Sequence, residues 1–366
     1  MSTGHSTAGQ IATLVGPATA ELQEYDVPAP GAGAVVLKIR RANVCGTDVH
    51  QWHYESAALR DSGLGHEFVG EILALGDGVT TDFAGQPVSV GDRVVPVYFL
   101  TCHRCPPCLR GEFNLCQNGL AEWKIKPEVS PHFRSGFATH YYLFPGQYFY
   151  KVPDEVDDET VAGANCGLAQ MLFVIDQVGI EPGETLVIQG AGGLGLYAAA
   201  VAHERGARVI AIDGVPERLA LAEEFGASET ISLADYPESA DRVARVQELT
   251  GGLGADMVLE VTGVPASFVE AIDIARTGGR IASVGNLNAE AEVTMIPGIL
   301  TRKSVHVHGV LRYHPPYLHK AIAFLARRQH AHPFHAFADR SYPLVEVTAA
   351  LKAGESRSVA RVAIVP

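Results

Sequence analysis

The sequence predicts a two-domain α/β protein, with a β-rich domain and a domain built on a doubly wound parallel sheet. The chain has 366 residues, which is too long for one ordinary core and fits two domains. Residues 11–40 are short apolar runs between Pro and Gly clusters, as expected of short antiparallel strands. From residue 185 onward, apolar strands alternate with helical stretches, which is the pattern of a parallel sheet.

The elements of the β-rich domain are predicted from local patterns. Residues 34–39 combine β-branched content with alternation, and residues 93–95 follow a turn at Gly91-Asp92. Further strands are expected around residues 136–143. A helix with an acidic first turn starts at residues 157–159, where the helix dipole favours carboxylates.

The parallel sheet is expected from four apolar strands: 185–189, 208–212, 257–261 and 280–284. Helices at 196–204 and 265–276 separate them. After residue 305 the chain leaves this domain, and a final strand at 358–365 returns to the first. We therefore expect the β-rich domain at 1–160 and 306–366 and the parallel-sheet domain at 161–305.

Composition limits the classes of partner. Hydrophobic residues make up 47% of the chain and charged residues 19%, as in folded soluble proteins. The 28 basic and 41 acidic residues give a net charge of −13, which argues against nucleic-acid and anionic-membrane surfaces. The sequence shows no apolar run of about 18 residues and no apolar stretch in its first ten, so we expect a cytoplasmic protein without a membrane partner.

A first metal site is predicted from Cys45, His66 and the distant Cys166. Two thiolates and an imidazole with a fourth position open form the ligand set of a catalytic zinc. Asp48 is placed to accept the second ring proton of the ligating histidine. Taken singly, Cys45 or His66 could instead be a buried core residue, and Cys166 in a Gly/Ala-rich stretch could be one too.

A second metal site is predicted from four cysteines in the pattern CxxCxxCx7C. Thiolates at this spacing can close a tetrahedral zinc shell within one segment. Free thiols and an iron–sulfur cluster are the alternatives, but ferredoxin runs place the fourth Cys after three residues and follow it with Pro. Gln117 follows here, so we expect a bracing zinc lobe at 102–116, formed by Cys102, Cys105, Cys108 and Cys116.

A glycine-rich stretch after the strand at 185–189 opens a helix, which is the context that a dinucleotide fingerprint requires. Asp213 ends the next strand, 18 residues after Gly195, where it would bind adenosine-ribose hydroxyls and repel a 2′-phosphate. This predicts NAD over NADP, although Arg218 nearby could meet a phosphate. The stretch is Gly190, Ala191, Gly192, Gly193, Leu194 and Gly195.

Two further strand ends are predicted to contact the cofactor. Thr262 and Gly263 follow the strand at 257–261, and Gly285 and Asn286 follow the strand at 280–284. Doubly wound sheets bind ligands at the carboxyl ends of their strands, so we expect Gly285 and Asn286 near the nicotinamide. Simple strand-end turns are the equally weighted alternative for all four residues.

Residues 65–70, with Gly76 and Val79, resemble the GHExxGxxxxxGxxV pattern of the zinc-containing medium-chain alcohol dehydrogenases. The resemblance covers essentially the whole chain. It implies a GroES-like catalytic domain beside a Rossmann domain, with Cys45 and His66 as ligands of the catalytic zinc. It places the third ligand in the region of Cys166, where polyol dehydrogenases often use Glu.

The resemblance also implies roles for side chains around the zinc. Thr47 would receive the alcohol proton, which would leave through the cofactor ribose and His50, while Glu67 would lie behind the zinc and could ligate it transiently. Arg361 matches a basic position near the cofactor pyrophosphate, and Tyr98 a substrate-pocket position. Trp52 and Tyr54 could extend that pocket for a bulky secondary or cyclic alcohol.

We therefore expect an NAD-dependent alcohol dehydrogenase with one catalytic and one structural zinc per subunit, acting on a small alcohol or carbonyl. A polyol, sugar or terpenoid-alcohol dehydrogenase of the same superfamily is the nearer alternative. A non-catalytic nucleotide-binding or redox-sensing protein is the remote one, since it would be expected to lack Thr47, His50 or a zinc ligand. Because the family forms dimers and tetramers, we expect a homo-oligomer.

Overall fold

The computed structural model describes residues 8–53, 61–285, 288, 290–356 and 361–366. The chain divides into two compact units: unit 1 is Met1–Ala169 with His314–Pro366, and unit 2 is Gln170–Tyr313. These limits follow residues 169 and 313, whereas the sequence analysis placed them after residues 160 and 305. Strand pairing and helix packing account for both differences.

At each of the two boundaries, the structure assigns a short helix or strand to the unit against which it packs. The helical turns that begin at Asp158 pack on strands β3 (Val35–Val44), β4 (Glu67–Leu75) and β5 (Arg93–Pro96) of unit 1. Strand β13 (His306–Gly309) pairs with β12 (Ala275–Ser283) and so belongs to the sheet of unit 2. Apolar and polar patterns do not reveal such pairing, because an edge strand and a linker can have the same composition.

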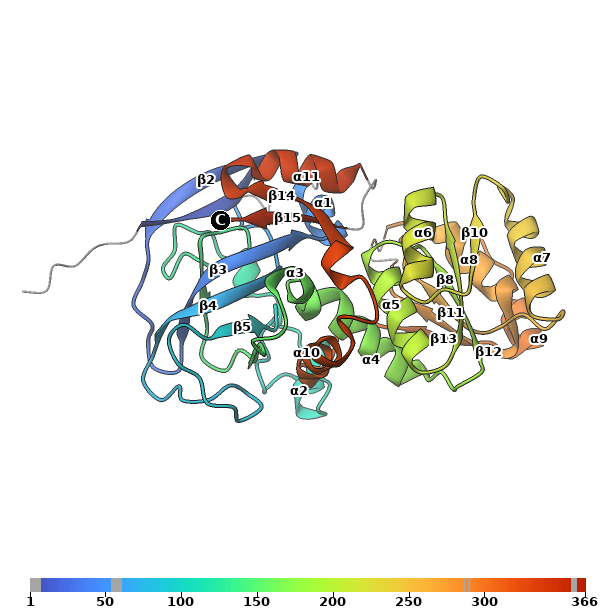
Figure 1. The fold of residues 1–366 in the computed structure, drawn as a ribbon, viewed down its shortest axis with the longest axis horizontal. Coiled ribbons are helices and arrows are strands. Elements are labelled where there is room, and N and C mark those ends of the chain that lie inside the picture. The colour runs from blue at the N-terminus through green and yellow to red at the C-terminus, as the bar shows by residue number, and fades with distance from the viewer. Residues whose placement is uncertain (1–7, 54–60, 286–287, 289, 357–360) are drawn as a thin grey trace, which may run out of the picture. The chain divides into compact units, whose positions relative to one another are not determined.

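Unit 1 is built on a seven-stranded sheet in the order β14-β15-β3-β4-β5-β7, with β6 paired to β3 (Figure 1). Its pairs are antiparallel except β14 with β15. A separate hairpin joins β1 and β2. The predicted β-rich domain is confirmed. The strands are β1 Ala8–Gly16, β2 Thr19–Asp26, β3 Val35–Val44, β4 Glu67–Leu75, β5 Arg93–Pro96, β6 His140–Leu143, β7 Phe149–Lys151, β14 Ala338–Pro343 and β15 Arg361–Val365.

Strand β3 runs through the middle of this sheet, and all its side chains are buried except Lys38 and Arg40. Val35 and Leu37 of β3 join Phe68 and Phe137 in the apolar core of the unit. Each such side chain contributes about 1.5–3 kcal/mol when fully buried. The core therefore fixes the carboxyl end of β3, from which the first candidate metal ligand follows.

Short helices cover the sheet of unit 1. Helix α11 packs against α1 and β15, which holds α1 close to the end of β3. A π-helical turn, η3, precedes α4 and packs on β4 and β5. The helices and helical turns of unit 1 are α1 Gly46–His53, α2 Pro106–Leu109, η1 Phe113–Leu115, η2 Glu122–Lys124, α3 Asp158–Val161, η3 Ala164–Leu168, α10 Pro316–Arg328, η4 Phe334–Phe337, η5 Leu344–Glu346 and α11 Val347–Glu355. Helix α4 (Ala169–Val178) belongs to unit 2 from Gln170 onward.

Unit 2 is a six-stranded parallel sheet in the order β10-β9-β8-β11-β12-β13 (Figure 1). This is the doubly wound order, and it confirms the predicted parallel-sheet domain. The strands are β8 Thr185–Gln189, β9 Arg208–Asp213, β10 Glu229–Ser232, β11 Ala255–Glu260, β12 Ala275–Ser283 and β13. The helices are α5 Gly193–Glu204, α6 Pro216–Glu224, α7 Ser239–Leu249, α8 Pro265–Ile274 and α9 Pro297–Lys303.

One row of side chains across strands β9, β8, β11 and β12 shows why their sequences are continuous apolar runs. Ile210, Val187, Val258 and Ile281 pair in register across β9, β8, β11 and β12, and all four are fully buried. Helices on both faces of a parallel sheet leave no solvated side. The chain order reverses between β8 and β11, which marks the expected ligand edge.

The helical run Asp158–Val178 is the one stretch of the described residues that is long and apolar enough to cross a membrane. Its most apolar window is 83% buried inside the protein. It includes the turn that carries Cys166 and packs on β4 and β5. We therefore interpret it as a core helix.

Candidate metal centres and dinucleotide site

Four side chains from three distant segments of unit 1 form a buried cluster. The candidate ligand atoms of Cys45, His66, Glu67 and Cys166 all lie within 4.8 Å of one another. Cys45 follows β3, His66 and Glu67 stand at the start of β4, and Cys166 lies in η3. Two thiols and an imidazole in a compact group match the ligand preferences of zinc, with the carboxylate at a possible fourth position. The donor set therefore fits the implied catalytic metal.

Asp48 ties two of these ligands together. The backbone N–H of Cys45 donates to one carboxylate oxygen of Asp48 at 2.8 Å, and Nδ1 of His66 contacts the other oxygen at 2.8 Å. Asp48 is fully buried in the first turn of α1. With Nδ1 held in this way, Nε2 of His66 remains the metal-facing nitrogen.

Cys166 is positioned by the fold around η3. A π-helical turn is rare and often marks a functional site, and here it carries the third candidate ligand. The neighbouring Asn165 donates its amide to the carbonyls of His66 and Pro96, at 2.9 and 3.0 Å. These bonds attach the turn to the start of β4 and the end of β5.

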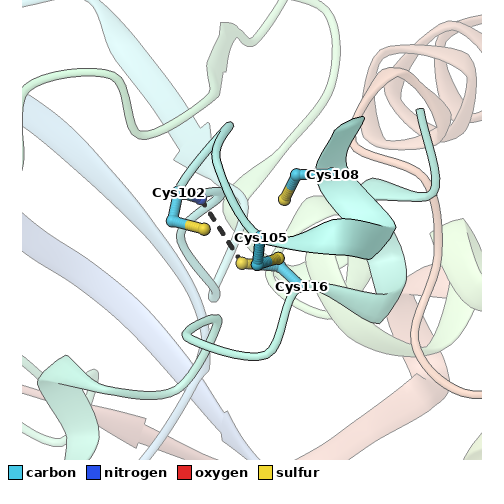
Figure 2. Close-up of side chains that lie close together, drawn as sticks. All are labelled: Cys102, Cys105, Cys108 and Cys116. Atoms are coloured by element: carbon cyan, nitrogen blue, oxygen red, sulfur yellow. Dashed lines mark hydrogen bonds between the residues drawn. The ribbon is translucent and has the colours of Figure 1, made fainter. Parts of the chain in front are cut away.

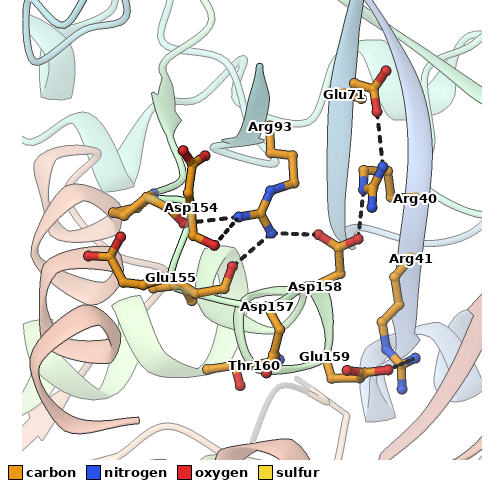
Figure 3. Close-up of polar contacts among 12 residues, drawn as sticks. Arg40, Arg41, Glu71, Arg93, Asp154, Glu155, Asp157, Asp158, Glu159 and Thr160 are labelled. Carbon is orange, nitrogen blue, oxygen red and sulfur yellow. Dashed lines mark hydrogen bonds and ion pairs between the residues drawn. The ribbon is translucent and has the colours of Figure 1, made fainter. Parts of the chain in front are cut away.

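Hydrogen bonds and ion pairs of acidic side chains hold α3, which precedes η3, against the sheet of unit 1 (Figure 3). The side chain of Asp157 accepts from the Thr160 N–H at 2.6 Å and caps α3. Asp158 accepts from Arg40 at 2.6 Å and from Arg93 at 3.0 Å, which joins α3 to β3 and β5. The predicted acidic helix start therefore anchors the segment that leads to Cys166.

Strong electrostatic coupling marks the buried cluster. A hydrogen bond with Cys166 holds the pKa of the Cys45 thiol well below its ordinary value, and the charge of Arg361 adds to the effect. The same hydrogen bond, with burial, raises the pKa of Cys166. Burial lowers the pKa of His66, but the interactions with Asp48 and Cys45 together more than offset it, so the net shift is upward. Cys45 is thus the thiol best prepared to bind a cation as a thiolate.

Glu67 and Arg361 form a buried ion pair beside the candidate ligands. Nε and Nη2 of Arg361 each lie 3.2 Å from one carboxylate oxygen of Glu67, and Nη2 is 3.7 Å from Sγ of Cys45. Burial raises the pKa of Glu67 to about 7, against the attraction of Arg361. The sequence analysis expected Arg361 near the cofactor pyrophosphate. Within unit 1, the structure shows Arg361 hydrogen-bonded to Glu67.

Thr47 and His50 lie three residues apart on α1 and therefore share a helix face. Thr47 is half-buried and His50 is exposed. Thr47 is therefore the more buried of the two and His50 the more exposed, as a proton path from the cluster to solvent would require.

The predicted pocket aromatics have different environments. Tyr98 is half-buried, and its ring centroid lies 5.2 Å from that of His66. Trp52 is only 1% exposed and packs in the core of unit 1, so its side chain stabilises the fold at that position. Tyr54 lies outside the described residues. Of the two described residues, Tyr98 is the one whose ring lies beside a candidate metal ligand.

The four-cysteine lobe is a separate, local cluster (Figure 2). Its sulfur atoms lie within 4.8 Å of one another, and the backbone N–H of Cys102 donates to Sγ of Cys116 at 3.4 Å. A backbone N–H bond from Arg104 lowers the pKa of Cys102 to about 5, and one from Cys108 lowers that of Cys105. Two thiols prepared as thiolates in a four-sulfur group fit a closed zinc site.

The glycine-rich turn after β8 has the tight geometry that a dinucleotide site needs. Gly190 has φ +102°, and a Cβ on Gly195 would lie 1.9 Å from the Gly190 carbonyl oxygen. Gly192 precedes α5, which Gly193 and Leu194 begin, so the helix amino terminus opens at the ligand edge of the sheet. These features leave room for pyrophosphate against the backbone.

Asp213 braces this turn at the end of β9. Its carboxylate accepts from the Ala191 N–H at 2.7 Å and from the Val215 N–H at 2.9 Å. Nη1 of Arg218 lies 3.7 Å from the position that a Cβ of Gly192 would occupy. The structure therefore brings a carboxylate and a guanidinium to the same glycine turn.

Thr262 and Gly285 meet at the neighbouring strand ends of unit 2. A Cβ on Gly285 would lie 2.8 Å from the Thr262 nitrogen and 2.5 Å from the Gly263 nitrogen. The fully buried Glu260 accepts from both backbone groups, at 2.8 and 3.0 Å, and fixes the turn. Asn286, also predicted to contact the cofactor, lies outside the described residues.

Three residues around these sites were not predicted from the sequence. Asn165 and Glu260 act through bonds to distant or turn backbone groups, and no spacing pattern indicates such bonds. Trp123 lies with its ring centroid 5.5 Å from that of His66. It comes from an irregular aromatic segment, in which an alternation or helix period could not be recognised.

Comparison with known proteins gives matches over most of the chain. Residues 31–154 match the family described as alcohol dehydrogenase GroES-like domain, and residues 193–327 match zinc-binding dehydrogenase. The 5-exo-hydroxycamphor dehydrogenase of Pseudomonas putida is 34% identical over 348 residues, 94% of each chain. The sorbitol dehydrogenase of Halalkalibacterium halodurans is 33% identical over 316 residues, 84% of this chain and 85% of that one.

A solved structure agrees with these sequence matches. The alcohol dehydrogenase of Thermotoga maritima superposes with a TM-score of 0.91 at 28% identity, covering 98% of this chain and 100% of that one. The chain therefore belongs to the zinc-type alcohol dehydrogenases of the medium-chain dehydrogenase/reductase superfamily.

Proposed function

We propose that this protein is an NAD-dependent zinc oxidoreductase that interconverts a secondary or bulky cyclic alcohol with its carbonyl product. The observation that carries the proposal is the buried group of Cys45, His66 and Cys166, which offers three ligands of the type that catalytic zinc takes. The relative that acts on 5-exo-hydroxycamphor supports a bulky cyclic substrate.

In this proposal Cys45, His66 and Cys166 hold one zinc, and the four cysteines of the lobe hold a second. When bound, zinc would supply Lewis acidity toward the alcohol oxygen and NAD would supply a hydride acceptor. Asp48 keeps Nε2 of His66 available for the metal through its contact with Nδ1. Thr47 accepts the alcohol proton, and the exposed His50 releases a proton to solvent.

The glycine turn of unit 2 would hold NAD. The amino terminus of α5 and the backbone beside Gly190 and Gly192 would face the pyrophosphate. Asp213 keeps free lone pairs after accepting two backbone N–H bonds, so it can accept from the ribose hydroxyls. Its negative charge disfavours a 2′-phosphate, whereas Arg218 acts in the opposite direction.

The test is initial rates of NAD and NADP reduction by zinc-replete protein over primary, secondary, polyol and cyclic alcohols. We expect activity with NAD and cyclic or secondary alcohols, with about two zinc ions bound per chain. Activity confined to polyols would support the second candidate function, a polyol dehydrogenase, which the sorbitol dehydrogenase relative favours. No activity on any alcohol in zinc-loaded protein would contradict the proposal.

We also propose a cytoplasmic homo-oligomer. Strand β13 lies at one end of the sheet of unit 2, and its four residues are exposed, including Val307 at 40%. Leu311, two residues after the strand, is 45% exposed, so an open strand edge lies beside an apolar side chain. Sedimentation should show a dimer or tetramer, and Val307→Lys should shift it toward the monomer. A monomeric wild type at micromolar concentration would refute this.

A further inference from the structure

Two aromatic rings, those of Tyr98 and Trp123, lie beside the candidate zinc ligand His66 in unit 1. The ring centroid of His66 lies 5.2 Å from that of Tyr98 and 5.5 Å from that of Trp123. The centroids of Tyr98 and Trp123 are 5.7 Å apart, with the ring planes inclined by 48°. The two larger rings therefore border the same imidazole and each other.

Trp123 is fixed in this position through its only polar atom. Nε1 of the indole donates to the backbone carbonyl of Tyr98 at 3.1 Å. The preceding Glu122 accepts from Arg134 at 2.9 Å, and Arg134 also bonds the Ser130 carbonyl, so the short turn η2 is held from a second side. Because the indole N–H is already used, the rest of the Trp123 side chain presents apolar surface only.

Exposure increases from the imidazole to the two rings. His66 is 3% exposed, whereas Tyr98 and Trp123 are only half-buried. The other tryptophan of the chain, Trp52, is 1% exposed in the core. Tyr98 and Trp123 are therefore accessible aromatic surface in direct contact with a candidate metal ligand, which is where a substrate skeleton must pack.

We infer that Trp123 is a specificity-determining residue, which forms with Tyr98 an apolar wall for the ring of an alicyclic or aryl alcohol. The inference rests on the proposed function and specifies its substrate class. Aromatic surface gains free energy by covering an apolar ring. It offers no hydrogen-bond partner to the extra hydroxyls of a polyol, whose desolvation on this wall would oppose binding.

The first experiment compares Trp123→Ala and Trp123→Phe with the wild type, using zinc-loaded protein and NAD. Cyclohexanol, 2-propanol and sorbitol are the substrates. Phe83→Ala is the matched control, because Phe83 is a 45% exposed aromatic residue of unit 1 whose ring packs against that of Tyr148. Zinc content is measured for every variant.

Trp123→Ala should lower kcat/KM for cyclohexanol about 10- to 100-fold, mainly through KM, and change that for 2-propanol less than about 3-fold. Trp123→Phe should retain most of the cyclohexanol rate, and Phe83→Ala should match the wild type. An equal loss with all substrates would mean that Trp123 only braces the fold, and an unchanged cyclohexanol to 2-propanol ratio would mean that it does not touch substrate. Either result would overturn the inference.

A binding measurement separates this inference from the proposed function. The protein has two tryptophans, and acrylamide should quench the half-buried Trp123 far more than the buried Trp52. Cyclohexanol should protect the quenchable fluorescence of the zinc-loaded wild type, whereas sorbitol should not. Protection without turnover would contradict the proposed function and support the wall. Equal protection by sorbitol, or none by cyclohexanol, would overturn the wall even in an active enzyme.

Discussion

The two candidate metal centres of unit 1 use similar ligand atoms, but the chain assembles them in different ways. The lobe takes its four thiols from one segment, between Cys102 and Cys116. The buried centre takes Cys45, His66 and Cys166 from the end of a strand, the start of another and a π-helical turn. A local site can close before the rest of the domain folds, whereas the distributed site requires the folded sheet.

Their surroundings differ as much as their sequence spacing. In the lobe, backbone N–H groups lower the pKa of Cys102 and Cys105, so the loop itself prepares two thiolates. In the buried centre, the side chains of Arg361, Asp48 and Glu67 set the charge around the ligands. The lobe thus resembles a bracing site, and the buried centre has the coupled titratable groups that are typical of catalysis.

The largest expected effect follows from removing a ligand of the buried centre. His66→Ala should reduce NAD-linked alcohol oxidation about 10³-fold or more, because Lewis-acid stabilisation is worth several kcal/mol and about 1.4 kcal/mol is tenfold. Zinc should fall from about two ions to about one per chain. His53→Ala, an exposed histidine on the same unit, serves as the control. Full activity in His66→Ala would remove the buried centre from the mechanism.

A lobe variant should give the opposite pattern. Cys108→Ser should lose the other zinc and lower stability by several kcal/mol, since structural zinc binding is folding free energy. Molecules that remain folded should keep their buried zinc and much of their kcat. Thermal unfolding, with metal content and rate measured on the same samples, checks this. A large loss of kcat at unchanged melting temperature would mean that the lobe takes part in the chemistry.

Much of the fold followed from the sequence, because the governing patterns are local. The four apolar runs predicted at 185–189, 208–212, 257–261 and 280–284 overlap strands β8, β9, β11 and β12. The glycine turn and the four-cysteine spacing each lie within one segment. Their residues could therefore be identified before any tertiary contact was known.

The remaining features depend on contacts between distant residues. Arg361 lies 294 residues from Glu67, and the backbone partners of Asn165 lie 69 and 99 residues away. Trp52 and Trp123 illustrate the same limit, because both are aromatic residues near a predicted ligand in sequence. One is buried in the core and the other contacts His66. Residue type and spacing do not distinguish these environments.

The smallest expected effect is on the stability of the metal-free protein, which should depend on pH through the buried centre but not in the same way through the lobe. Burial raises the pKa of Glu67 from 4.5 to about 7 in the metal-free protein, whereas the candidate ligands of the lobe are all thiols. A carboxyl group whose folded pKa is raised is harder to ionise in the folded state. The metal-free protein should therefore lose stability as pH rises from about 4.5 to about 7, by an amount on the order of 3 kcal/mol.

Glu67→Gln should abolish this contribution, because the amide does not titrate. The unfolding free energy of the wild type should therefore fall relative to that of Glu67→Gln across that pH range, and the difference should level off above it. Urea unfolding of chelator-treated protein at several pH values measures the difference. Glu71→Gln is the control, because Glu71 lies on the same strand with a 37% exposed side chain. Zinc should flatten the wild-type slope, because a bound cation favours ionised Glu67. If the unfolding free energies of the metal-free wild type and Glu67→Gln change in parallel with pH, the prediction is wrong. Arg361 would then keep the Glu67 carboxylate ionised in the folded protein throughout this pH range.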